Sequence, residues 1–128
     1  MPTATEHNEK FNHKTEFDSY IKDPKFSDWQ ITACFYSALH LVQLCLHDKY
    51  GLTDNQMTNH NETKDMVAKY LSSAEDDYDD LLSLSYTSRY KSVSSQNSCD
   101  CEDAMKCLQN IVDICNSLYG SHNRFKLA

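Results

Sequence analysis

The chain has 128 residues, of which 40% are hydrophobic and 24% are charged, and its net charge at pH 7 is −7. This length is typical of a single domain that buries about two thirds of its unfolded surface, so neither a metal ion nor a disulfide is needed for folding. The acidic balance disfavours a broad basic face that would grip nucleic-acid phosphates without regard to sequence.

Helix-breaking residues are scarce in this chain. Its only two prolines are Pro2 and Pro24, and it has only two glycines, which favours long helices over many short strands. Six cysteines are present, but residues 1–10 are polar throughout and do not resemble a secretory leader. We therefore expect reduced thiols and a cytoplasmic location.

The first predicted helix covers residues 6–21 and ends at the Asp23-Pro24 break. The second covers residues 27–49 and stops at Gly51, which favours the left-handed conformation of a helix end. Its apolar positions follow helical spacing over a wide face, which predicts the central helix of a bundle. The apolar stretch from residue 31 to 46 is shorter than the ~20 residues that a bilayer requires, so we expect no membrane contact.

A polar loop over residues 52–59 leads to a short predicted helix over 60–71. The fourth helix begins in the acidic run at residue 75 and ends near residue 90, since negative charge favours a helix N-terminus. A serine-rich turn over 92–97 precedes the last helix, which Gly120 closes. The sequence therefore predicts one all-α domain over residues 1–128, with its core at about 6–120, built as an antiparallel bundle of four to five helices.

A stripe of polar and aromatic residues runs along the second helix, opposite its densest apolar face. Its members are Trp29, Tyr36, His40, Gln43 and His47. Two interpretations stay open for this stripe: the wall of a cleft or a dimer surface, and a half-buried flank packed against a neighbouring helix.

An arginine on the fourth helix needs a partner. Arg89 shares a helix face with Tyr78, Ser85 and Tyr86, and a buried guanidinium is costly unless it is paired. The partner is either a carboxylate, Asp18 or Asp28, or a bound phosphate or RNA.

The third helix opens with a histidine, His60, followed by Asn61. A histidine there can serve as a general acid or base, because its pKa is near neutral pH. The alternative is a capping or surface role.

No metal site is predicted, and no cofactor. Cys99, Cys101 and Cys107 do not form CxxC pairs, and His40 and His47 are about 10 Å apart along one helix, too far to share an ion. Cys101 and Cys115 fit the apolar stripe of the last helix as small buried residues.

Several short motifs resemble the HEPN family, as found in small prokaryotic proteins. They are Asn12-His13, Asp28-Trp29, Phe35-Tyr36-Ser37-Ala38-Leu39-His40, His60-Asn61, Ser88-Arg89-Tyr90 and Glu102-Asp103-Ala104. The resemblance covers about residues 12–118. It implies an antiparallel helical bundle, often dimeric, in a family of metal-independent ribonucleases, toxins paired with nucleotidyltransferase antitoxins, phage-defence components and non-catalytic members.

The ribonuclease members of that family carry a histidine about four to six residues after an arginine, and no histidine follows Arg89 at this spacing. The resemblance therefore implies an accessory protein that binds RNA or a nucleotide, or partners a nucleotidyltransferase or a defence protein, as a homodimer. The alternatives are a toxin-like, metal-independent ribonuclease and a structural dimerisation module. The candidate catalytic residues are Arg89, His40 and His60, and the candidate ligand-binding residues are Trp29, Tyr36, Asn61 and Tyr90.

Overall fold

Helices make up the regular structure of the described chain. The computed structural model describes residues 4–20, 27–90, 98–121 and 124–127, without the side chains of residues 4, 15–20, 27, 89–90 and 98–99. The elements are α1 (Ala4–Tyr20), α2 (Ser27–Tyr50), η2 (Asp54–Gln56), α3 (His60–Tyr70), η3 (Ser72–Ala74), α4 (Glu75–Tyr90) and α5 (Ser98–Leu118). No strand occurs within these ranges, which confirms the predicted all-α bundle.

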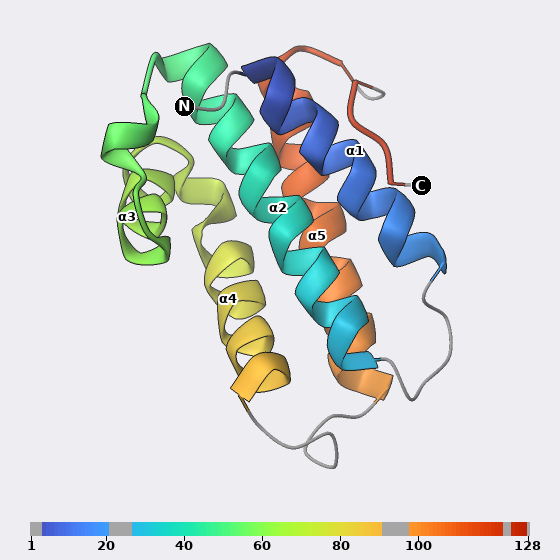
Figure 1. Ribbon diagram of the computed structural model, residues 1–128. Helices are drawn as coiled ribbons and strands as arrows, with labels where there is room; N and C mark the ends of the chain where they lie inside the picture. The colour runs from blue at the N-terminus through green and yellow to red at the C-terminus, as the bar shows by residue number, and fades with distance from the viewer. Residues whose placement is uncertain (1–3, 21–26, 91–97, 122–123, 128) are drawn as a thin grey trace.

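The helix α2 lies at the centre of the bundle, with α1 on one side, α4 on the other and α5 behind it (Figure 1). Consecutive long helices run in opposite directions, so α2 and α5 run the same way. In the described ranges, no helix combines the length and the apolar character that crossing a bilayer requires. Because α1 and α4 lie on opposite sides of α2, one face of α2 lies between them.

The apolar faces predicted for the second and last helices form the core. On α2 the fully buried apolar side chains are Ile31, Cys34, Phe35, Ala38, Leu41, Val42, Cys45 and Leu46, and on α5 they include Ala104, Leu108, Ile111 and Cys115. Burial of such side chains contributes about 1.5–3 kcal/mol each relative to full exposure. The helical spacing therefore identified the two helices that carry most of the core.

Two glycines end the helices, as predicted. Gly51 and Gly120 have φ angles of 67° and 63°, which side chains with a Cβ rarely adopt. The amide of Gly51 donates to the carbonyl of His47 at 3.1 Å, and the amide of Ser121 donates to that of Asn116 at 3.1 Å. The turn at Gly51 sends the chain back along the bundle, where Leu52 is buried.

The core extends beyond the predicted limit at residue 120. Phe125 is only 4% exposed, and its ring lies 6.0 Å from that of Phe11 and 5.4 Å from that of Tyr119. The side chain of Asn116 holds this segment, because it accepts a hydrogen bond from the amide of Phe125 at 2.8 Å and donates to its carbonyl at 3.0 Å. The short tail has too few apolar residues for a periodic signal, so the sequence did not predict this contact.

Three cysteines, Cys34, Cys45 and Cys115, are fully buried, whereas Cys101 is half-buried. A hydrogen bond with Cys45 and burial raise the pKa of Cys115. Because the thiolate is the reactive form, we expect iodoacetamide to leave these three thiols unmodified in the native protein and to modify them in guanidinium. Peptide mass spectrometry checks this, and rapid native modification of Cys115 would contradict its placement.

Candidate functional site

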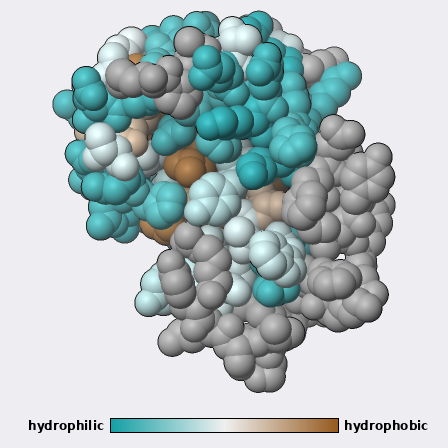
Figure 2. Space-filling model, viewed as in Figure 1, coloured by the Kyte–Doolittle hydropathy of each residue, from teal (hydrophilic) through white to brown (hydrophobic). Residues whose placement is uncertain are grey.

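The predicted stripe of α2 faces the space between α1 and α4. Trp29 is 59% exposed, and Tyr36, His40, Gln43 and His47 are half-buried. Figure 2 shows apolar and weakly polar atoms in the middle of this face, below a more hydrophilic upper part. The half-buried flank predicted as one alternative is therefore confirmed for four of the five residues and wrong for Trp29, which presents most of its surface to solvent.

Two hollows lie on either side of this stripe. The first, of about 360 Å³ between α1 and α2, is lined by His13, Lys14, Trp29, Thr32, Ala33 and Tyr36. The second, of about 730 Å³ between the start of α3 and α4, is lined by Asn59, His60, Asn61, Leu82, Ser83, Tyr86 and Thr87. Both volumes fall within the range of small-molecule sites.

Residues that line the two hollows are in ring contact with each other. The ring of Tyr36 lies 6.2 Å from that of His60, and the buried ring of Phe35 supports His60 at 5.2 Å, edge to face. Between α2 and α4, the hydroxyls of Thr32 and Ser88 are 2.9 Å apart and share a hydrogen bond. We call the two hollows with the Tyr36–His60 contact the aromatic groove.

The aromatic groove differs in charge from the rest of this acidic chain. Among the described residues, neither hollow is lined by an aspartate or a glutamate, and the first contains Lys14. A third hollow, between α4 and α5, is lined by Asp77, Asp80 and Asp103. These three carboxylates gather beside that third hollow, and no described carboxylate lines the aromatic groove.

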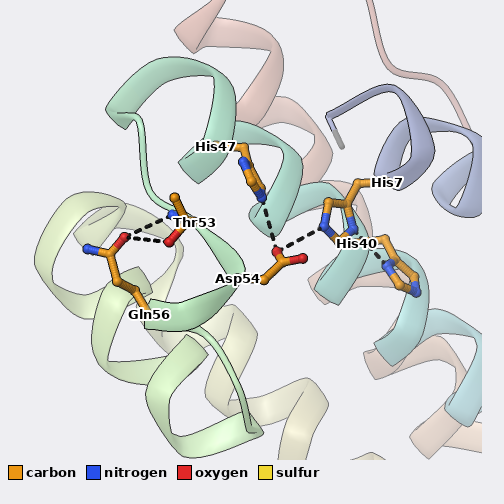
Figure 3. A network of polar contacts seen from close by, with 6 residues as sticks. All are labelled: His7, His40, His47, Thr53, Asp54 and Gln56. Atoms are coloured by element: carbon orange, nitrogen blue, oxygen red, sulfur yellow. Dashed lines mark hydrogen bonds and ion pairs between the residues drawn. The ribbon is translucent and has the colours of Figure 1, made fainter. Parts of the chain in front are cut away.

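A cluster of histidines lies at the other end of the stripe, where α1, α2 and η2 meet (Figure 3). The Nε2 atom of His47 lies 3.0 Å from Oδ1 of Asp54, and Nε2 of His7 lies 3.5 Å from the same oxygen. On the far side of the His7 ring, its Nδ1 atom lies 3.3 Å from Nδ1 of His40. We call these four residues the histidine cluster.

Burial dominates the electrostatics of the histidine cluster. It lowers the pKa of His40 to about 4, with smaller effects from His7, Lys10 and Lys14, and it also lowers the pKa of His7. Burial alone would raise the pKa of Asp54, but the nearby imidazole rings of His47 and His7 together hold that pKa below its usual value. His40 is therefore neutral at pH 7, and Asp54 is a carboxylate.

Two members of the histidine cluster, His7 and Asp54, were not predicted as site residues from the sequence. His7 is one turn before Phe11, and both are buried on the inner face of α1, so the pair was a signal that the weak pattern of the first helix concealed. Asp54 reaches the cluster because the turn at Gly51 folds η2 back beside the end of α2. Sequence spacing does not encode that approach.

The structure places the predicted site residues in two groups. Trp29, Tyr36, His60 and Asn61 line the aromatic groove, whereas His40 belongs to the histidine cluster. The capping role considered for His60 is wrong, because Asn59 caps α3 by accepting a hydrogen bond from the amide of Glu62 at 2.9 Å.

The side chains of two further candidates, Arg89 and Tyr90, lie outside the described residues, although their backbone belongs to α4. The proposed pairing of Arg89 with a histidine, or with Asp18 or Asp28, stays a prediction. The face of α4 that carries Arg89 points inward at Tyr78 and Ser85, which are fully buried, but the same expectation is wrong at Tyr86, which is 55% exposed.

The fold and the site define a small helical-bundle protein with an aromatic groove and a histidine cluster on one face. No protein-family model, curated protein or solved structure matches the chain. The resemblance to the HEPN family therefore stays a prediction from the sequence motifs.

Proposed function

We propose that the chain is a HEPN-like accessory protein whose aromatic groove binds a nucleotide, either free or within single-stranded RNA. The observation that carries this proposal is the ring contact between Tyr36 and His60, which line two hollows with exposed aromatic rings at both ends. Unpaired bases stack on such rings, and each stacked base contributes about 1–3 kcal/mol.

The polar residues of the groove suit the rest of a nucleotide. Asn61 offers an amide donor and acceptor for a base edge, and Lys14 offers a positive charge for a phosphate. Among the described residues, Lys14 is the one cation that lines the groove, so the groove supports binding that depends on stacking more than on phosphate contacts. Such binding should show a shallow dependence on salt.

Trp29 is the only tryptophan of the chain, so its fluorescence reports on the groove alone. We expect AMP or a short single-stranded RNA to quench it in a saturable way. Tyr36→Ala should weaken the affinity roughly 5- to 150-fold, because one stacking partner is lost, whereas Tyr36→Phe should keep it. The fluorescence titration measures both effects.

Tyr50→Ala is the matched control, since Tyr50 is an exposed tyrosine of the same helix that lines neither hollow of the groove. Equal losses in Tyr36→Ala and Tyr50→Ala would refute the groove as the binding site. Trp29 emission that changes with protein concentration alone would indicate that a second copy covers this face, as the dimerisation alternative requires. RNA cleavage in EDTA that Arg89→Ala abolishes would support the ribonuclease alternative.

A further inference from the structure

The histidine cluster contains two possible metal-ligand atoms that make no hydrogen bond. The side chain of His7 is only 3% exposed, yet its Nε2 atom makes no hydrogen bond, and neither does the buried Oδ2 atom of Asp54. Buried polar atoms of native proteins are almost always paired. Two such atoms in adjacent side chains therefore indicate a missing partner at this point.

The spacing of the donor atoms fits a small cation. One donor atom from each of His7, His47 and Asp54 can be chosen so that all three lie within 4.8 Å of one another. Zinc bonds of about 2.0–2.1 Å in a tetrahedron separate neighbouring ligand atoms by about 3.3 Å. The His7–Asp54 and His47–Asp54 distances of 3.5 and 3.0 Å fall on either side of this value.

We propose that His7, His47 and Asp54 bind a divalent transition-metal ion of the zinc class, with His40 as a positioning residue behind His7. Two imidazoles and one carboxylate suit zinc better than calcium or magnesium, which prefer oxygen ligands. Three protein ligands leave the fourth position of a tetrahedral ion open to water or to an exogenous ligand. The side chains of His47 and Asp54 are 19% and 20% exposed, which gives the ion a route in.

The contact between His7 and His40 is compatible with the same arrangement, because either ring can be its donor. A metal ion on Nε2 of His7 requires the proton of that ring to be on Nδ1, which then donates to Nδ1 of His40. In the absence of an ion, this tautomer would direct the lone pair of Nε2 at the carboxylate of Asp54. A bound cation removes this repulsion and fixes the ring orientation.

Such an ion would connect three secondary-structure elements, of which α1 is distant in the sequence from the other two. His7 comes from α1, His47 from the last turn of α2 and Asp54 from η2. Because the unfolded chain does not hold the three ligands together, the binding energy would stabilise the fold. This inference does not depend on nucleotide binding in the aromatic groove.

The test is zinc binding to full-length protein that has been stripped with a chelator. Isothermal titration calorimetry should give one ion per chain, and zinc at about 100 times its dissociation constant should raise the melting temperature by roughly 10 °C. Cobalt(II) should give the visible absorption of a four-coordinate ion. His47→Gln and Asp54→Asn should each weaken zinc binding tenfold or more, with unchanged circular dichroism in the absence of metal.

Glu9→Gln is the matched control, because it changes the net charge as Asp54→Asn does, from an exposed position on α1. His40→Ala should weaken zinc binding about 10- to 100-fold without changing the stoichiometry. His40→Gln should recover part of this loss, because its carbonyl can still accept from His7. Absence of zinc binding, or binding that His47→Gln and Asp54→Asn leave unchanged, overturns the proposal.

Tyr36→Ala separates this site from the aromatic groove, since it should weaken nucleotide binding and leave the affinity for zinc unaltered. Zinc affinity that falls in Tyr36→Ala as far as in Asp54→Asn would mean that the cluster is not the binding site.

Discussion

Replacing Phe35 by alanine should lower the free energy of unfolding by about 3–5 kcal/mol. The side chain is fully buried on α2, and its ring lies 5.2 Å from those of Tyr36 and His60 and 5.8 Å from that of Tyr78. Truncation leaves a cavity among α2, α3 and α4, and these helices cannot close it without losing their own packing. Urea unfolding followed by far-ultraviolet circular dichroism measures the loss.

Tyr86→Ala is the control for this experiment, because it removes an aromatic ring that is 55% exposed. Its effect should be about 1 kcal/mol or less. Phe35→Leu, which refills most of the volume, should fall between the two variants. If Phe35→Ala costs no more than Tyr86→Ala, Phe35 does not occupy the core.

Replacing Asn116 by alanine should lower the free energy of unfolding by about 2 kcal/mol or more. Asn116 is 4% exposed and makes two hydrogen bonds to the backbone of Phe125. Each buried backbone group that loses its partner costs about 1–3 kcal/mol. The segment can escape part of this cost by detaching from the bundle, which then withdraws Phe125 from the core.

Asn110→Ala tests whether the effect is specific. Asn110 is an exposed asparagine of the same helix, with a hydrogen bond of 3.3 Å to Asp77, and its loss should change stability by less than about 0.5 kcal/mol. Hydrogen exchange gives the local measurement. The exchange rate of the Phe125 amide should rise in Asn116→Ala and stay unchanged in Asn110→Ala. Equal protection in both variants would show that Asn116 does not hold the segment.

The fold could be predicted from the sequence because its main determinants are local. The apolar face of α2 and that of α5 repeat at three- and four-residue steps, and Gly51 and Gly120 mark the points where these helices end. The predicted bounds of α3 and α4, residues 60–71 and 75–90, agree with the observed His60–Tyr70 and Glu75–Tyr90. Tertiary contacts reinforce these local preferences and do not override them.

The candidate site was only partly predictable, because its residues come together through tertiary packing. The stripe on α2 was visible as a helix face, and it provides Trp29 and Tyr36 to one end of the site and His47 to the other. No metal site was predicted from the sequence, because the spacing of histidines was compared within one helix only. The proposed ion instead takes one ligand from each of three segments, and no spacing rule connects His7 with Asp54.

The exposure of Trp29 decides which spectroscopic signal can follow unfolding. Its indole ring is already largely hydrated in the native protein, so the emission wavelength should shift little when the chain unfolds. A fluorescence melting curve would therefore underreport the loss of the core, and a blue shift would mean that something has covered the ring. Helical circular dichroism is the appropriate measure of stability, and tryptophan emission is the appropriate measure of occupancy.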